Sequence, residues 1–392
     1  DDSDVELIET IILTFGTLVN STTTETDVTL NLLSDDNPTL NSIGYDKDSF
    51  AEHQTIKITG TISEAHSKDI TIPLTITGSA TRESDYSTAF GSKGTSTVAG
   101  GNGQGGNALN MLSSPYGLTV DDSGNVYVAD TSNGRIMKWA PGAIEGVKII
   151  DVYRPYGIHV DASNNIYVST QYGDTVYKYT YSGGSYTQTT VAGGNGLGSE
   201  LNQLDSPAGI HIDDSGNVYV ADVNNHRIVK WAVGATVGEL VAGGNGYGNA
   251  LNQLYNPRGL TVDSSGNVYV ADYNNSRIVK WAVGATEGVI MYGYQRSFDL
   301  EFDALGNLYS ADHQNHRIMK FSAGVSFGVV VAGTGSSGSG SDQFYFPVAI
   351  ALDISGNVYV ADQTNQRIQK IQLSPEIFIE SGSTTGVLSI TG

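Results

Sequence analysis

The feature that most restricts the fold of this chain is an internal repeat between residues 91 and 372. Six copies of one pattern align on a shared aspartate, at Asp121, Asp161, Asp213, Asp263, Asp303 and Asp353. Within each copy, apolar and polar residues alternate in twos over three short segments, which is the period of β-strands. Four-stranded units that recur every roughly 40 to 50 residues are typical of the blades of a β-propeller.

A fourth strand is expected after most copies, where the segments that begin at Val191, Val241 and Val331 read Val-Ala-Gly. The last copy has no such segment after Ile371, but residues 97–101 read Thr-Val-Ala-Gly-Gly and precede the first copy. We therefore predict that residues 97–101 form the outer strand of the sixth blade and close the ring. Closure leaves no long unpaired sheet edge.

The repeated line, PxGLxVDxxGNVYVADxxNxRIxKW, resembles the NHL-repeat family of six-bladed propellers. Copies two and five depart most from it. Copy two has Thr170 and Thr175 in place of the aspartate and arginine of ADxxNxR, and copy five lacks the Pro-x-Gly start. The resemblance implies an all-β, six-bladed propeller over residues 91–374.

The flanking segments are rich in Thr, Ser and Ile, and their strands and acidic turns resemble pieces of a Calx-β domain in a changed order. Residues 38–90 resemble the first part of such a β-sandwich, and residues 375–392 resemble its continuation. Residues 1–36 resemble its closing strands. The resemblance implies an Ig-like sandwich into which the propeller is inserted, because ring closure brings the two propeller ends together.

Residues 1–36 are predicted to complete the sandwich of a preceding unit, because the segment that links them to residues 38–90 is short. Circular permutation, in which they fold back onto their own chain, is the alternative. The predicted partner is thus an identical neighbouring unit, joined head to tail either covalently in a tandem protein or by strand exchange between subunits. Either arrangement propagates into a fibre.

The Calx-β resemblance also implies a calcium site, because these domains gather carboxylates from several loops at one end of the sandwich. The matching residues are Glu52, Asp85, Asp1, Asp2 and Glu9. Since Asp1 and Asp2 would come from the neighbouring unit, calcium bound there would stiffen the joint. The alternative is a set of solvated acidic turns.

Within the propeller, an aspartate is followed five residues later by an arginine, as in Asp222 with Arg227 and Asp272 with Arg277. The pair recurs in five copies, so we predict a structural role at the hairpin between the second and third strands. An active site is rarely built five times.

Two groups of residues on the innermost strands are candidates for ligand binding. The second residue after Pro-x-Gly gives a ring of Thr119, His159, His211, Thr261, Glu301 and Ala351. Histidine and glutamate near a channel are metal-ligating types, but the same positions also suit packing between blades, which we expect. Arg154, Arg258 and Arg296 stand near the strand starts and are candidates for binding an anion.

With 41 acidic and 20 basic residues, the formal net charge is −21, which disfavours nucleic acid as a partner. No apolar run suggests membrane insertion, and an extracellular or cell-surface location is expected. We predict a structural or adhesive repeating unit of a surface fibre, not an enzyme, whose propeller presents a face to glycans or surface proteins. The alternative is a secreted propeller that binds a small ligand or acts as an enzyme, with the sandwich as carrier.

Overall fold

The computed structural model describes residues 94–101, 103–293, 295–323 and 328–373, together with short strands at 10–14, 28–30, 40–45, 57–62, 70–76 and 385–390. The chain divides into two compact units, one of Asp1–Gly91 with Ser374–Gly392 and one of Ser92–Leu373. None of the helices among the described residues has the length and apolar character needed to span a membrane.

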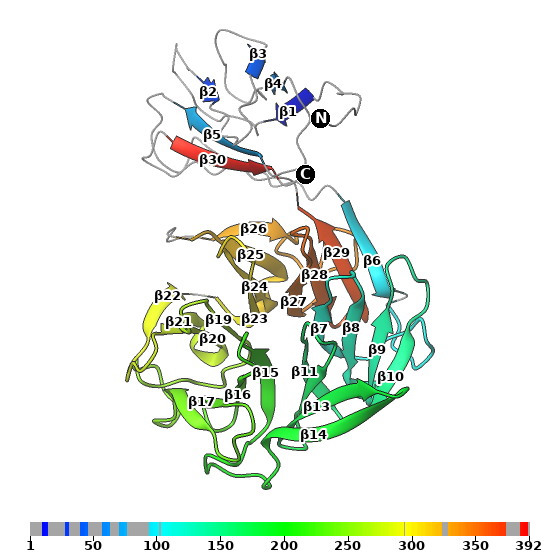
Figure 1. The fold of residues 1–392 in the computed structure, drawn as a ribbon, viewed down its shortest axis with the longest axis vertical. Helices are drawn as coiled ribbons and strands as arrows, with labels where there is room; N and C mark the ends of the chain where they lie inside the picture. Colours follow the sequence, from blue (N-terminus) through cyan, green and yellow to red (C-terminus); the bar gives the residue numbers. More distant parts are fainter. Residues whose placement is uncertain are drawn as a thin grey trace. The chain divides into compact units, whose positions relative to one another are not determined.

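The larger unit consists of six four-stranded antiparallel sheets, which are the blades of a propeller (Figure 1). In each blade the first strand lies innermost and the fourth lies at the outer edge. The strands of blade 1 are β7 (Pro115–Val120), β8 (Val126–Asp130), β9 (Arg135–Trp139) and β10 (Val147–Asp151). Those of blade 2 are β11 (Pro155–Val160), β12 (Ile166–Thr170), β13 (Thr175–Ser182) and β14 (Ser185–Gly193). Those of blade 3 are β15 (Pro207–Ile212), β16 (Val218–Asp222), β17 (Arg227–Trp231) and β18 (Glu239–Gly243).

The remaining three blades follow the same order. Blade 4 contains β19 (Leu260–Val262), β20 (Val268–Asp272), β21 (Arg277–Trp281) and β22 (Val289–Gly293). Blade 5 contains β23 (Ser297–Phe302), β24 (Leu308–Asp312), β25 (Arg317–Phe321) and β26 (Val329–Ala332). Blade 6 contains β27 (Pro347–Leu352), β28 (Val358–Asp362), β29 (Arg367–Gln372) and β6 (Gly94–Gly100). Short 3₁₀ turns, η1 (Thr131–Asn133), η2 (Tyr273–Asn275) and η3 (His313–Asn315), join the second and third strands of blades 1, 4 and 5.

The ring closes between the two ends of the propeller sequence. Strand β6 pairs antiparallel with β29, with Gly100 opposite Arg367 and Gly94 opposite Gln372. The predicted closing strand is therefore confirmed, and it begins three residues earlier than the sequence pattern indicated. The pairing gives β29 a neighbour on both sides, as the third strand has in every other blade.

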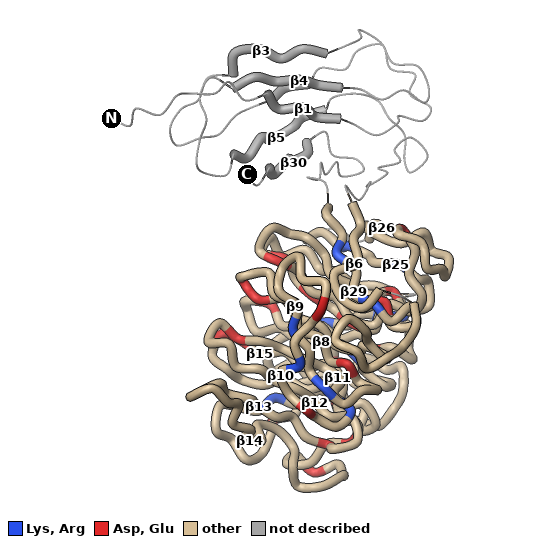
Figure 2. Tube along the Cα trace, turned by 90° about the vertical axis from the view of Figure 1, so that its right-hand side faces the viewer, with Lys and Arg blue, Asp and Glu red and all other residues tan. Residues whose placement is uncertain are grey.

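The second strand of each blade forms the centre of the hydrophobic packing. Its Val-Tyr-Val-Ala-Asp sequence is buried at every position in blades 1, 3, 4 and 6. Apolar residues on both of its faces pack against the adjacent blades. The third strands of blades 1, 3 and 4 end in Trp139, Trp231 and Trp281, which have 1–2% of their surface exposed. Charged residues of both signs are interspersed along the part of the propeller that Figure 2 presents, around β8, β9 and β10.

The glycine of Pro-x-Gly allows the inner strands of adjacent blades to approach each other. The Gly209 N–H donates to the carbonyl oxygen of Arg258 at 2.9 Å. A Cβ on Gly209 would lie 2.6 Å from that oxygen, which a backbone atom cannot relieve by moving aside. The motif is thus explained by how closely the strands pack around the channel.

The repeated Asp-x-x-Asn-x-Arg motif fastens the long segments that enter the blades. We term its three side chains the latch, and the segment from the fourth strand of one blade to the inner strand of the next the connector. In blade 4, the Oδ2 atom of Asp272 accepts hydrogen bonds from Arg277 Nε at 2.7 Å and from Asn275 Nδ2 at 2.8 Å. The Arg277 Nη groups donate to the connector carbonyls of Asn249, Ala250 and Gln253, at 2.9, 3.0 and 2.9 Å. The predicted structural role of the aspartate–arginine pair is confirmed, and it extends to a connector more than 20 residues away in the sequence.

The long connectors 101–114, 194–206, 244–259 and 333–346 lead into blades 1, 3, 4 and 6, and the latch arginine of each blade contacts its own connector. The connectors into blades 2 and 5 are only residues 152–154 and 294–296. Blade 2 has Thr170 and Thr175 at the latch positions. The departures of copies two and five therefore coincide with the loss of a long connector.

The smaller unit contains two three-stranded sheets built from β1 (Thr10–Thr14), β2 (Val28–Leu30), β3 (Leu40–Tyr45), β4 (Lys57–Ile62), β5 (Ile70–Ile76) and β30 (Thr385–Ile390). Strand β1 pairs with β4 and β2 pairs with β5, so both N-terminal strands pair within their own chain. Such pairing corresponds to the circularly permuted alternative. The same registers are open to the equivalent strands of a second copy, so completion of a neighbouring unit stays a prediction, as does the Calx-β assignment.

Candidate functional site

The inner strands of all six blades line a central cavity of about 210 Å³. Of the ring predicted from the sequence, Thr119, His159, His211, Glu301 and Ala351 border this cavity, whereas Thr261 is buried beside it. The residues on the inner strands differ from blade to blade. The repeat therefore places four types of residue, Thr, His, Glu and Ala, at equivalent positions around one channel.

His159 and His211 are neighbours in the channel, with ring centroids 6.3 Å apart. Each also meets a tyrosine edge to face, Tyr167 and Tyr219 respectively, with both centroid separations at 6.3 Å. Burial lowers the pKa of each histidine to about 4, so both imidazoles are neutral at pH 7. Within the described ranges, no three His, Cys, Asp or Glu side chains come together as a metal site.

Two carboxyl groups of blade 5 face the same channel. Burial raises the pKa of Asp299 to about 7, although its oxygens accept hydrogen bonds from the N–H groups of Ile350 and Leu300, both at 3.0 Å. Burial and, to a smaller extent, the nearby Asp299 carboxylate raise the pKa of Glu301 to about 8. Glu301 is therefore mostly protonated at neutral pH and able to donate a proton.

Asp299 is a site residue that the sequence interpretation missed. Four of the other blades have glycine at its position, which allows the close approach of inner strands described for Gly209. Asp299 instead bridges to the next blade through its side chain, at the N–H of Ile350. The signal was present in the sequence as the missing Pro-x-Gly of copy five.

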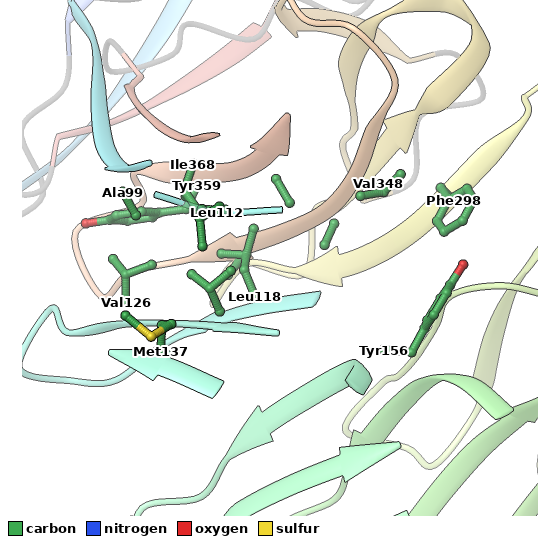
Figure 3. Packing of buried hydrophobic residues seen from close by; sticks show 14 of the residues in the cluster. Ala99, Leu112, Leu118, Val126, Met137, Tyr156, Phe298, Val348, Tyr359 and Ile368 are labelled. Atoms are coloured by element: carbon green, nitrogen blue, oxygen red, sulfur yellow. The ribbon is translucent and has the colours of Figure 1, made fainter. Parts of the chain in front are cut away.

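Aromatic rings from blades that are distant in sequence meet at the end of the channel where the inner strands begin; we term this end the mouth. The rings of Tyr116 and Tyr156 stack with centroids 4.5 Å apart. Phe298 lies 6.0 Å from Tyr116 and 6.3 Å from Tyr156, on the opposite side of the ring of blades. Figure 3 shows Tyr156 and Phe298 facing each other from separate strands.

Arg258 occupies the centre of the mouth. Its guanidinium lies 5.3 Å from the centroid of Phe298, and Nη1 donates to the Tyr156 hydroxyl at 3.1 Å. The Nε atom is inaccessible to solvent and has no hydrogen-bond partner. Among the described residues, no carboxylate forms an ion pair with Arg258. An arginine this poorly satisfied is unusual, since buried donors are nearly always hydrogen-bonded.

Two further arginines stand at the same face. Arg154 lies over the ring of Tyr172 at 5.8 Å, and Arg296 lies 6.0 Å from the centroid of Tyr273, which Arg258 approaches at the same distance. Arg296 Nε donates to the Ser276 hydroxyl at 3.2 Å. Neither arginine forms an ion pair with a carboxylate of the described residues. The structure therefore gathers the three predicted anion-binding arginines around one mouth.

His313 completes the aromatic surface without adding charge. Its ring stacks on Phe298 at 5.0 Å and on Phe346 at 4.7 Å. Burial is the main cause that lowers the pKa of His313 to about 4, and the nearby positive charges of Arg258 and Arg296 also lower it. The positive charge of the mouth therefore comes from its arginines.

The predicted calcium ligands Glu52, Asp85, Asp1, Asp2 and Glu9 lie outside the described residues. The calcium site between units accordingly stays a prediction.

Comparisons with known proteins agree on the fold. A protein of unknown function from Bacteroides thetaiotaomicron is 15% identical, with a TM-score of 0.60 over 95% of this chain and 99% of that one. A gluconolactonase from Xanthomonas campestris is 12% identical, with a TM-score of 0.53 over 68% of this chain and 89% of that one. A putative gluconolactonase is also 12% identical, with a TM-score of 0.52 over 71% and 94% of the two chains. A search of curated proteins gave no match.

These structures correct the prediction that the chain is not an enzyme. That prediction followed from the expected role as a repeating unit of a surface fibre, whereas a protein described as a gluconolactonase has a fold of the same kind, so the fold does not exclude an enzyme. The repeated aspartate–arginine pairs form latches, as predicted, but they carry no information on the channel, where Thr119, His159 and Glu301 stand at equivalent positions of different blades. A model of the NHL repeat matches residues 112–139, 204–231 and 254–281, and the chain accordingly carries NHL repeats within a six-bladed β-propeller.

Proposed function

We propose that the propeller binds a small organic anion at the mouth of its central channel. The observation that carries the proposal is Arg258, whose buried Nε lacks a partner and whose guanidinium lacks a carboxylate among the described residues. A partly buried cation with an unsatisfied buried N–H is costly, and a ligand carboxylate would supply both the counter-charge and the missing acceptor. Arginine suits this task, since its planar donors match a carboxylate in two parallel hydrogen bonds.

The surroundings of Arg258 indicate what the body of the ligand would be. Tyr116, Tyr156 and Phe298 present ring faces and edges around the guanidinium. The cavity beneath them, about 210 Å³, is smaller than a typical pocket for a drug-sized molecule, which is about 300 Å³ or more. A compact carboxylic acid with a flat ring or a single sugar ring would fit these limits. Arg154 and Arg296 would strengthen the local positive potential in a chain that is otherwise acidic.

The channel beneath the mouth has groups that could act on a bound molecule. Protonated Glu301 is a proton donor at neutral pH, and neutral His159 and His211 are proton acceptors. Donor and acceptor groups in one channel are the requirement for general acid–base chemistry. The proposed function is therefore ligand binding at the mouth, with proton transfer as the reaction class available to the site.

Matched pairs of acid and neutral isostere test the proposal by isothermal titration calorimetry. We expect benzoate to bind more tightly than benzamide, or glucuronate more tightly than glucose, by at least about tenfold. Arg258→Met should abolish this preference, because methionine keeps the apolar stem and removes the charge. Lys148→Met is the matched control, since Lys148 is an exposed cation that pairs with Asp151. Equal affinity for acid and isostere, or an unchanged preference in Arg258→Met, would overturn the proposal.

Head-to-tail assembly of identical units into an extracellular fibre is a second proposal. It rests on the registers of β1 with β4 and of β2 with β5, which form within one chain here and which the equivalent strands of a second copy could also form. Light scattering over a range of protein concentrations, with and without calcium chelator, tests it. Concentration-dependent growth would support the assembly, and monomers at all concentrations would exclude strand exchange. Loss of growth on chelation would support calcium at the joint.

A further inference from the structure

The latch of blade 5 is complete, but it holds no connector segment among the residues that the structure describes. Asp312, Asn315 and Arg317 occupy the three latch positions, and Arg317 Nε donates to Asp312 Oδ2 at 2.9 Å, as in the other latches. The connector into this blade, residues 294–296, is too short to supply the segment that the other latches bind. The Arg317 side chain is 29% exposed, against 6–10% for the four latch arginines that hold a connector.

The occupied latches define what is missing. In each of them, arginine Nη groups donate to three connector carbonyls, and the latch asparagine donates to the carbonyl of a preceding glycine, Gly248 in blade 4. The latch aspartate accepts from a connector N–H, that of Tyr255 in blade 4, at 2.7 Å. In blade 5, Asn315 Nδ2 instead donates hydrogen bonds to both carboxylate oxygens of Asp312, at 3.0 Å each. Among the described residues, no carbonyl takes the place of the connector at Arg317.

An apolar anchor is missing at the same place. Each long connector buries one large side chain completely beside the glycine that ends the preceding fourth strand. These anchors are Leu112, Leu204, Leu254 and Phe344, each 0–1% exposed. A Cβ on Gly243 would lie 2.9 Å from Leu254, whereas a Cβ on Gly293, which pairs equivalently before blade 5 but lacks the positive φ of Gly243, would meet nothing within 4 Å. The space and the polar groups of the latch are thus both left open by the described residues.

We propose that the blade 5 latch is a docking site for a peptide loop of a partner chain that resembles this protein's own connectors. The four connectors share the pattern Gly-(Asn or Ser)-x-x-x-(Gln or Met)-(Leu or Phe), seen in residues 248–254 as GNALNQL. A partner loop of this pattern would give its backbone carbonyls to Arg317 and Asn315, give one N–H to Asp312, and bury its apolar residue at Gly293. Backbone recognition supplies most of these contacts, and the buried apolar residue supplies selectivity.

The shape of the bound loop follows from the connectors. In blade 4 the Gly248 N–H donates to the Leu254 carbonyl, which closes the segment into a compact loop. A free linear peptide loses conformational entropy to adopt that shape, so a closed peptide is expected to bind more tightly. A disulfide-closed peptide of sequence CYGNALNQLYC, which contains residues 247–255, is therefore the probe.

Fluorescence anisotropy of the labelled closed peptide with the full chain tests the proposal. We expect saturable binding, with at least about tenfold loss in Arg317→Met and in Gly293→Leu, which fills the anchor space without altering the latch. A peptide with aspartate in place of the anchor leucine should bind at least about tenfold more weakly. Arg258→Met should leave binding unchanged, which separates this site from the mouth. Absence of saturable binding to the unmodified chain, or binding unaffected by both Arg317→Met and Gly293→Leu, would overturn the proposal.

Discussion

Two arginines at blade 4, Arg277 in β21 and Arg258 at the end of the connector before β19, are used in opposite ways. Arg277 pairs with Asp272 at 2.7 Å and donates to three connector carbonyls, and its side chain is 6% exposed. The Arg258 side chain forms one hydrogen bond among the described residues, to the Tyr156 hydroxyl, and its buried Nε has no partner there. The difference indicates that satisfied arginines build the propeller and unsatisfied ones are available to a ligand.

The comparison is tested most strongly by removing each charge in turn. Arg277→Met should lower the free energy of unfolding by about 3–5 kcal/mol, because it leaves the buried Asp272 carboxylate uncompensated and releases the connector. Arg258→Met should change it by less than about 1 kcal/mol, since no carboxylate is left unpaired. Urea denaturation of the two variants measures both effects. Similar losses in the two variants would show that Arg258 is as structural as Arg277.

The latches also show why part of this fold could be predicted from the sequence. Alternating strands, the shared aspartates and the displaced closing strand are local patterns, and each was recognised without a structure. The aspartate–arginine pairs were also predicted as structural, because they recur at a fixed spacing. The partners of the arginines were not predicted, since backbone carbonyls such as that of Asn249 leave no signal in residue identity.

The mouth was less predictable because its residues come from blades that are distant in the sequence. Tyr116, Tyr156 and Phe298 meet only because closure of the ring places their blades around one channel. The three arginines were identified as anion-binding candidates, but nothing in their spacing showed that they lack carboxylate partners. Asp299 was missed although its position, where most blades have glycine, marked it as different.

The buried anchor of an occupied connector sharpens the contrast between blades 4 and 5. Leu254→Ala should lower the free energy of unfolding by about 3 kcal/mol, because a completely buried leucine is replaced by a cavity between blades. Gly293→Leu should change it by less than about 1 kcal/mol, because the position beside the empty latch is open. Thermal and urea unfolding measure both variants. A large loss in Gly293→Leu would indicate that blade 5 has no open anchor space.

Unlike the latch aspartates, the channel carboxyls Asp299 and Glu301 have no cation partner among the described residues, and this predicts a pH effect. The pKa of Glu301 is raised from 4.5 to about 8, so the folded chain keeps a proton that the unfolded chain releases. The stability that the folded state gains from the protonated Glu301 carboxyl is fully present below about pH 4.5. It is lost progressively as the pH rises from there to about 8. The glutamine of Glu301→Gln cannot ionise. The free energy of unfolding of this variant should therefore exceed that of the unmodified chain by about 1–3 kcal/mol near pH 9 and equal it near pH 5.

Urea denaturation across this pH range measures the difference between the two proteins. Glu145→Gln is the control, because Glu145 is an exposed glutamate of blade 1 and its replacement should give no such divergence. A constant difference between Glu301→Gln and the unmodified chain at all pH values would show that Glu301 is ionised in both the folded and unfolded states.

The smallest expected effect concerns the empty latch itself. Arg317→Met should lower the free energy of unfolding by about 1–2 kcal/mol, less than the loss for Arg277→Met, since it leaves the buried Asp312 without a cation but releases no connector. The buried Asp312 carboxylate keeps its two hydrogen bonds from Asn315 when the arginine is removed. If the closed peptide occupies this latch, its addition should raise the melting temperature of the unmodified chain but not that of Arg317→Met, because a ligand that binds only the folded state stabilises it. A loss in Arg317→Met as large as that in Arg277→Met would mean that the blade 5 latch already supports the fold as the occupied latches do, and the distinction between the two blades would fail.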